Sequence, residues 1–133
     1  MLAVLLAGLT LTGCGPRTVG GEAGLGEEFS LSIGQKAIIK GEKLELTFVR
    51  VTEDSRCPKG ATCVWEGRAT SVVSIVSNNT TEIELSEPGL TASPYQYIFR
   101  DYWITFHLLP YPEVGKEITS DQYRLQMSVS KLK

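Results

Sequence analysis

Two cysteines, Cys57 and Cys63, lie in the stretch of the chain that is densest in chemically distinctive residues, Glu53–Gly67. A disulfide between them would close a short loop and stabilise the fold by roughly 2–2.5 kcal/mol in the chain-entropy model. The alternative is a metal site that uses both thiolates. Zinc, however, takes about four ligands, and the sequence holds a single histidine, His107. We therefore predict a disulfide and no metal site.

Four residues beside these cysteines form a candidate binding loop: Asp54, Arg56, Trp65 and Glu66. Tryptophan is enriched among the residues that dominate protein interfaces, so an exposed Trp65 could anchor a partner. We favour the structural alternative, in which the Trp65 ring covers the disulfide and the three charged residues form a local ion-pair and turn network. Calcium binding at Glu53 and Asp54 is a weaker alternative.

Catalysis needs acids, bases or nucleophiles that converge on one point, and the sequence gives little sign of them. His107 is the only histidine, and no serine follows the pattern of a nucleophile on a sharp turn. A hydrolase built from carboxylates alone stays open, with these candidates: Glu53, Asp54, Glu66 and Asp101. Their spacing gives no reason to expect that they converge. We therefore predict that the protein is not an enzyme and needs no cofactor.

Residues 2–11 form an unbroken run of apolar and small side chains. A run of about ten residues has the length of a signal-peptide hydrophobic region and is shorter than the roughly 20 needed to span a bilayer. It leads into Leu11–Cys14, Leu-Thr-Gly-Cys, which resembles the lipobox of bacterial lipoprotein signals, although no lysine or arginine follows Met1. The resemblance implies that Cys14 is lipidated and that residues 1–13 are a signal peptide. The alternative is an ordinary secretory signal with a coincidental cysteine.

Lipidation also accounts for the odd number of cysteines. The chain has three cysteines, and an exported protein with three would otherwise keep one free thiol. With Cys14 lipidated, Cys57 and Cys63 remain as a pair in an oxidising compartment, where disulfides persist. Acyl chains hold a domain at a membrane by burying their methylenes. We therefore expect an exported protein that is anchored to a bacterial membrane and faces the periplasm or the cell exterior.

Composition divides the rest of the chain. Residues 14–27 are rich in glycine and poor in large apolar side chains, which predicts a flexible tether. Residues 28–133 are enough for a single domain with a core of its own. The net charge is −2 at pH 7 and basic residues do not cluster, which excludes a nucleic-acid-binding protein.

Alternating apolar and polar residues predict β-strands throughout this domain. Leu44, Leu46 and Phe48 share one strand face, after which Val49 and Val51 switch to the other face. Such a switch indicates either a β-bulge or a strand that is covered on both sides.

Turn residues separate the predicted strands. Gly41-Glu42 suits a two-residue hairpin, and Asn78-Asn79 suits a tight turn. The only helical segment that we expect is a single turn near residues 119–122. Seven or eight short strands indicate an all-β fold, an antiparallel β-sandwich that is immunoglobulin-like in general architecture. A partly open β-barrel is the alternative.

Four segments together carry a resemblance: residues 54–58, 63–67, 34–35 and 110–112. With their Asp-Ser-Arg-Cys-Pro and Cys-Val-Trp-Glu-Gly motifs, they resemble a group of small, uncharacterised bacterial secreted proteins and lipoproteins. The resemblance covers most of the globular part and implies an architecture but no activity. We therefore predict a lipid-anchored extracytoplasmic binding module of the cell envelope, with an envelope protein or a glycan as its partner. The alternatives are a loop-based protease inhibitor and a purely structural envelope accessory protein.

Overall fold

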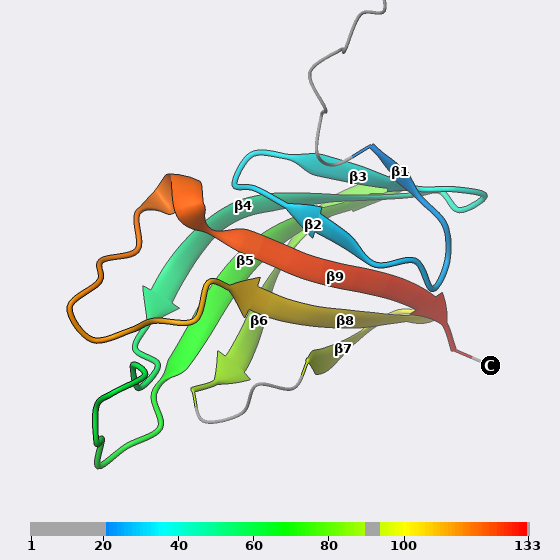
Figure 1. The fold of residues 1–133 in the computed structure, drawn as a ribbon. Coiled ribbons are helices and arrows are strands. Elements are labelled where there is room, and N and C mark those ends of the chain that lie inside the picture. The colour runs from blue at the N-terminus through cyan, green and yellow to red at the C-terminus, as the bar shows by residue number, and fades with distance from the viewer. Residues whose placement is uncertain (1–20, 90–93, 133) are drawn as a thin grey trace, which may run out of the picture.

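The computed structural model describes residues 21–89 and 94–132, which fold into two β-sheets packed face to face (Figure 1). The strands in these residues are β1 (Glu22–Ala23), β2 (Phe29–Leu31), β3 (Lys36–Ile39), β4 (Leu44–Asp54), β5 (Arg68–Ser77), β6 (Asn79–Pro88), β7 (Tyr95–Phe99), β8 (Tyr102–Leu109) and β9 (Arg124–Lys131). The five-stranded sheet has the order β1-β3-β4-β5-β6, and the four-stranded sheet has the order β2-β9-β8-β7. Neighbouring strands are antiparallel, except that β1 and β3 are parallel. The predicted β-sandwich is confirmed and the partly open barrel is wrong, although the described residues form nine strands rather than seven or eight.

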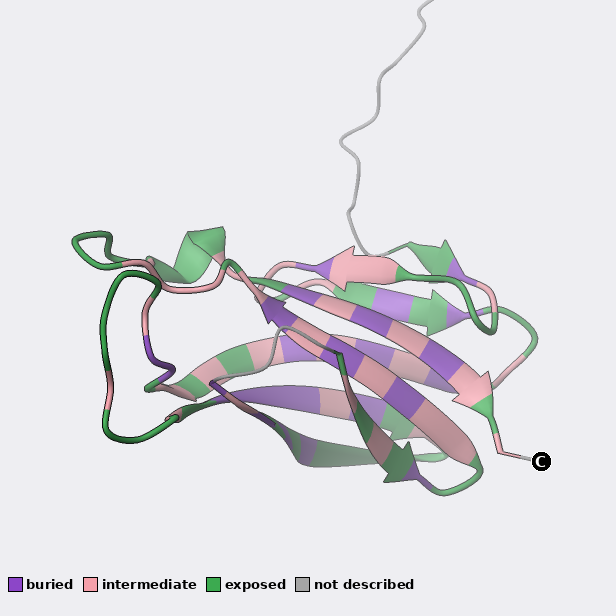
Figure 2. Ribbon diagram, turned by 60° about the horizontal axis from the view of Figure 1, so that its bottom comes forward, coloured by how far each residue is buried: buried purple, intermediate pink, exposed green. Residues whose placement is uncertain are grey.

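The core lies between the two sheets, because each strand turns every second side chain inward. In β9, for example, Leu125, Met127 and Val129 are buried and the residues between them are more exposed. Figure 2 shows the same alternation of buried and more exposed positions along β4 and β8, whereas β5 has an unbroken run of buried residues from Ala69 to Val73. Burying one such side chain stabilises a fold by roughly 1.5–3 kcal/mol.

Two irregularities in the β4–β5 pair explain the change of apolar face that the sequence shows at Val49. The register shifts between Phe48 and Arg50 and again between Val51 and Glu53. Each extra residue turns the side chains that follow to the opposite face. Val51 therefore packs against the core again, and the predicted bulge is confirmed.

The turns agree only in part with the sequence. Asn78 has a φ of 66° between the paired residues Ser77 and Asn79, which confirms the tight turn. The two-residue hairpin predicted at Gly41-Glu42 is wrong, because residues 40–43 all lie between the strands. Gly41 has a φ of 76° and occupies the third position of a turn closed by the hydrogen bond from Glu42 N to Ile39 O, where a type II turn needs positive φ.

A single 3₁₀ turn, η1 (Ser120–Gln122), confirms the predicted helical turn, and the described residues contain no α-helix. In the same part of the chain, no helix is long and apolar enough to cross a membrane.

The described part of the predicted tether packs against the sandwich. Ala23, in β1, is buried, and its carbonyl accepts a 2.8 Å hydrogen bond from Lys40 N. Gly26 N donates a 2.7 Å hydrogen bond to the carbonyl of Val129 in β9. The domain therefore includes residues 21–27, whereas Cys14 and the predicted signal peptide lie outside the described residues.

Candidate binding site

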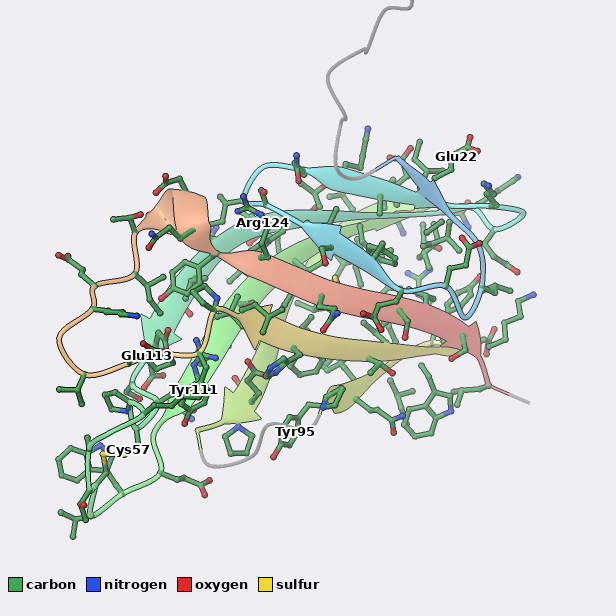
Figure 3. All side chains as sticks on the ribbon, viewed as in Figure 1. Glu22, Cys57, Tyr95, Tyr111, Glu113 and Arg124 are labelled. Atoms are coloured by element: carbon green, nitrogen blue, oxygen red, sulfur yellow. A yellow bond between two sulfur atoms is a disulfide. The ribbon has the colours of Figure 1, made fainter. Side chains whose placement is uncertain are left out.

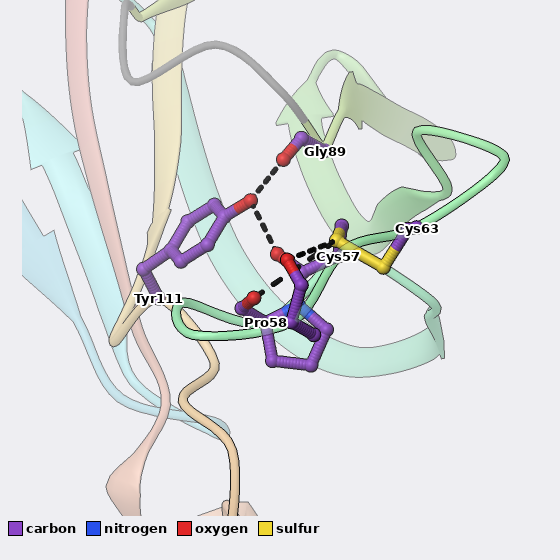
Figure 4. The surroundings of a disulfide bond; sticks show 6 residues. Cys57, Pro58, Cys63, Gly89 and Tyr111 are labelled. Atoms are coloured by element: carbon purple, nitrogen blue, oxygen red, sulfur yellow. Dashed lines mark hydrogen bonds between the residues drawn. A yellow bond between two sulfur atoms is a disulfide. The ribbon is translucent and has the colours of Figure 1, made fainter.

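The loop between β4 and β5, residues 55–67, is called the signature loop here. Cys57 and Cys63 form a disulfide with a Cα–Cα distance of 5.9 Å, as predicted (Figure 4). Inside this small ring, Ala61 N donates a 3.1 Å hydrogen bond to Pro58 O. Gly60 supplies the positive φ of 90° that the turn requires. The disulfide therefore closes one compact turn at the far end of the two long strands.

Arg56 fixes the base of the signature loop. It is only 3% exposed, and its guanidinium donates two hydrogen bonds to the carboxylate of Asp54, with Nε–Oδ1 at 2.8 Å and Nη2–Oδ2 at 2.9 Å. Its nitrogens also donate to the carbonyls of Leu108 at 2.8 Å and Pro110 at 3.1 Å. A two-pronged, charge-assisted pair of this kind is among the stronger polar interactions in proteins. Arg56 therefore joins the signature loop to the end of β8 in the opposite sheet.

Glu87, in β6, completes the same buried cluster. One carboxylate oxygen accepts a 2.8 Å hydrogen bond from Leu108 N and lies 3.6 Å from Arg56 Nη1. The other lies 3.0 Å from His107 Nδ1. Strand β7 pairs with β8 only as far as Phe106. Beyond that point, the side chains of Arg56 and Glu87 supply the backbone hydrogen bonds that a neighbouring strand would otherwise make.

Two tyrosines close the end of the sandwich around this cluster. Tyr111 lies after β8, and its hydroxyl donates a 2.8 Å hydrogen bond to the carbonyl of Cys57 and also contacts the carbonyl of Gly89 (Figure 4). The Arg56 guanidinium lies 5.2 Å from the centre of the Tyr111 ring, within the range of a cation–π interaction. Tyr123 donates a 2.8 Å hydrogen bond to Asp54 Oδ2.

Two glycines let backbone segments cross at this point. A Cβ atom added at Gly67 would lie 1.7 Å from the carbonyl oxygen of Ser55, and one added at Gly89 would lie 2.0 Å from that of Glu66. Gly67 also has a φ of 66°, which favours glycine. Any other residue at position 67 would force the two ends of the signature loop apart, and any other residue at position 89 would displace the backbone at Glu66 and Arg56.

The cluster is charged and fixed at neutral pH. Burial raises the pKa of the Asp54 carboxyl, but the hydrogen bonds from Arg56 and Tyr123 outweigh burial and hold that pKa below its usual value. Burial lowers the pKa of Arg56, yet the partner Asp54 outweighs it and raises the pKa above its usual value. Burial and the hydrogen bond to Asp54 raise the pKa of Tyr123 to about 12. Asp54 and Arg56 therefore form an ion pair at neutral pH, and Tyr123 is a neutral donor.

The tip of the signature loop, Val64 and Trp65, is exposed, whereas the base of the loop is buried. The two side chains are 94% and 69% exposed, and no hydrogen bond or ion pair among the described residues holds either of them. The structural alternative for Trp65, a ring packed into this end of the sandwich, is therefore wrong. Arg56 and Tyr111 are the side chains that close this end of the sandwich.

A second loop, residues 110–119, lies beside the disulfide-closed turn of the signature loop and is bonded to it at Lys59. Lys59 N donates to Pro112 O at 2.9 Å, and Val114 N donates to Lys59 O at 3.0 Å. Val114 is 58% exposed, so it adds apolar surface next to the signature loop. Figure 3 shows Cys57, Tyr111 and Glu113 together at this end of the molecule, far from Glu22. A hollow of about 260 Å³ opens beside Tyr111 in the second loop.

The structure thus separates the predicted site residues into two groups. Asp54 and Arg56 belong to the buried cluster, whereas Trp65 and Glu66 lie at the exposed part of the loop. The expected ion pair between Asp54 and Arg56 is present, but the Glu66 side chain forms none among the described residues. No group of three or more possible metal ligands occurs in the part of the chain that the structure describes.

Sequence reasoning missed three members of the cluster: Glu87, Tyr111 and Tyr123. A signal for Glu87 was available, because Ile83 and Leu85 set the inward face of β6 and Glu87 continues it two residues later. Tyr123 offered a comparable signal, because it precedes Leu125 by two residues on the same inward face, whereas Tyr111 lies outside the strands and offered none.

Comparison with known proteins finds no match: no family model fits the sequence, and neither a curated protein nor a solved structure is similar to it. The resemblance drawn from the sequence motifs stays a prediction.

Proposed function

We propose that this protein is a lipid-anchored binding module of a bacterial cell envelope, and that the tip of its signature loop contacts an envelope protein. The observation that carries this proposal is the exposure of Val64 and Trp65 at 94% and 69% on a loop whose base is immobilised. Exposed apolar side chains of this size are unfavourable in water unless a partner covers them. Tryptophan is also among the residues that contribute most to binding energy.

Rigidity of the loop supports the same function. The Cys57–Cys63 disulfide and the hydrogen bonds of Arg56 hold the loop in one conformation. A partner that binds a loop already ordered in this way avoids most of the entropy loss that a flexible loop would incur. The free energy gained by burying Trp65 then appears as affinity.

The position of Gly21, the first residue that the structure describes, also fits this role. Gly21 adjoins β1, on a different side of the sandwich from the signature loop (Figure 1). A lipid on Cys14 would leave seven residues to reach Gly21, a span of at most about 25 Å. The domain would be held close to the membrane with the tip directed away from its point of attachment.

Crosslinking and pull-down from membranes, with the tethered protein as bait, tests this proposal. The tip variant carries Val64→Ser and Trp65→Ala together, and the matched control carries Leu25→Ser, which removes an exposed apolar side chain from the loop between β1 and β2. Asp54 and Arg56 are unsuitable targets, because their loss would disturb the fold. We expect wild type and control to capture the same protein and the tip variant to lose it. Equal capture by the tip variant would show that the tip is not the binding site.

A loop-based protease inhibitor is a second candidate, and one observation favours it. Val64 and Trp65 directly follow a disulfide-bonded cysteine, so a rigid, exposed segment could occupy a protease's substrate cleft. Titration of a panel of cysteine and serine proteases tests this function, and no inhibition at micromolar protein would reject it. A purely structural role is left if both experiments are negative.

A further inference from the structure

We propose that the outer face of the four-stranded sheet binds uncharged glycan chains. This face lies away from the tip of the signature loop, and the inference does not depend on the function proposed for that tip. Because side chains alternate along each strand, the inward residues of β8 and β9 leave a set of outward ones between them. The central outward residues are Gln96, Ile98, Trp103, Thr105, Ser128 and Ser130.

The first argument is the charge difference between the two outer faces of the sandwich. The outer face of the five-stranded sheet carries ion pairs: Lys36–Glu45 at 3.8 Å, Arg50–Glu82 at 3.5 Å and Arg68–Glu53 at 2.8 Å. None of the six residues at the centre of the four-stranded face can be ionised, and the ionisable side chains beside them, Glu28 and His107, lie at the edge of the face. Hydroxyl and amide groups without fixed charge match a ligand that is itself neutral and rich in hydroxyls, and they offer little to a charged one.

The second argument is the pair formed by Ile98 and Trp103. The two residues are directly opposite in the register of β7 and β8, and Ile98 is 54% exposed. A sugar ring has one apolar face of C–H groups, which packs against an indole ring while the hydroxyls at its edge reach polar neighbours. In the register, Trp103 is opposite Ser130 and Thr105 is opposite Ser128, so those neighbours are present.

The third argument is a shallow depression beside this platform. It has a volume of about 30 Å³, and it is lined by Glu28, Thr105, His107, Gln126 and Ser128 among others. A recess of this size can hold a water molecule or a sugar hydroxyl. His107 is held there through Nδ1 by Glu87 at 3.0 Å, which leaves Nε2 for a ligand. The face thus combines an apolar platform with a small polar recess.

A second copy of the chain fits this face poorly. A stable protein interface buries roughly 800 Å² on each partner around an apolar centre. Here the apolar centre consists of Ile98 and Trp103, and the rest is hydroxyl and amide. A polyhydroxylated chain that lies across the strands is therefore the occupant that these side chains favour.

Fluorescence titration of the full chain tests the inference. The protein has two tryptophans, so the variant Trp65→Phe leaves Trp103 as the only indole. The probes are hexasaccharides of β-1,4-glucose, α-1,4-glucose, β-1,4-N-acetylglucosamine and α-1,6-mannose, with a polyuronic acid as the charged comparison. We expect saturable binding of at least one neutral probe, and stronger binding to it than to the polyuronic acid.

Two matched substitutions locate the site. Thr105→Glu introduces a charge into the four-stranded face, and Thr47→Glu introduces the same charge at an outward position of β4 in the other sheet. We expect Thr105→Glu to weaken glycan binding about tenfold or more, while Thr47→Glu leaves it unchanged and both keep the melting temperature. Ser128→Glu replaces Thr105→Glu if that variant does not fold.

Three results would overturn the inference. One is the absence of a saturable response to every neutral probe up to about 10 mM, the weakest affinity of interest. Another is binding that survives a charge at both Thr105 and Ser128. The last is a dimer in light scattering that Thr105→Glu dissociates, because a second copy would then be the occupant of this face.

Discussion

Arg56 and Trp65 belong to one loop, yet their surroundings are opposite. The Arg56 side chain is buried and donates hydrogen bonds to Asp54, Leu108 and Pro110. The Trp65 side chain projects into solvent without a polar partner among the described residues. The signature loop therefore contains buried residues that fix it to the sandwich and exposed residues that are available to a partner.

The comparison also shows why buried base residues and exposed tip residues occur together in one loop. An exposed tryptophan gives up little entropy on binding only when its loop is already held in place. The buried base holds it, and the disulfide closes the turn just before the tip. Substitutions that separate stability from binding test this division, and those at the base should have the largest effects.

Arg56→Met should have the largest effect on stability. It removes the hydrogen bonds to two carbonyls and leaves the carboxylates of Asp54 and Glu87 without their cation, at an expected loss of about 3–5 kcal/mol in the free energy of unfolding. Chemical denaturation measures the loss. The control is Arg68→Met, whose exposed ion pair with Glu53 should contribute less than about 1 kcal/mol. Equal effects of the two substitutions would refute the distinction between base and surface.

Gly67→Ala should follow, with a loss of about 2–4 kcal/mol from positive φ and from the overlap with the Ser55 carbonyl. Gly41→Ala is the matched control, because Gly41 has a φ of 76° but no atom within 4 Å of its added Cβ. Its cost should be the backbone strain alone, about 1–2 kcal/mol. Thermal melts of both variants check this order, and a larger effect at Gly41 would contradict the crossing of segments at Gly67.

Tyr123→Phe should have a smaller effect of about 1 kcal/mol at neutral pH, the contribution of one hydrogen bond. Its pH dependence is more diagnostic. The pKa of Tyr123 is raised to about 12 in the folded protein, above about 10 in an unfolded chain. The stabilisation is fully present below about pH 10 and is lost as the pH rises through about 12. Between those pH values, the free energy of unfolding from chemical denaturation should fall more steeply for wild type than for Tyr123→Phe. Parallel curves would show that Tyr123 does not donate a hydrogen bond to Asp54.

Trp65→Ala should have the smallest effect on stability, within about 0.5 kcal/mol, because its side chain packs against little. Its effect on partner capture should be the largest of any single substitution. A drop in melting temperature as large as that of Arg56→Met would mean that the ring is structural, as the sequence first suggested.

Much of the fold followed from the sequence, because period-two alternation sets a strand and its inward face directly. The strand that carries Leu125, Met127 and Val129 is an example, and the bulge near Val49 is another. The disulfide was equally accessible from the count of cysteines. These features depend on residues that are near one another in the chain.

The site was harder to predict, because its contacts join distant segments. Arg56 meets Leu108 and Pro110 across 52 and 54 positions of sequence, and Tyr123 meets Asp54 across 69. Local patterns cannot say which side chain completes such a cluster. The wrong expectation for Trp65 has the same origin, since the side chain that closes this end, Tyr111, comes from another loop.

The hydrogen bonds of Glu87 and Arg56 with the backbone of Leu108 in β8 have one further consequence. An exposed strand edge can recruit a strand from another molecule and so begin aggregation. Strand β7 stops opposite Phe106, which would leave the rest of β8 open to such pairing. The NH and carbonyl of Leu108 are instead taken by Glu87 and Arg56, and an incoming strand would have to displace a buried ion pair to reach them. The two side chains thus protect the sheet from edge-to-edge association where it has no strand to do so.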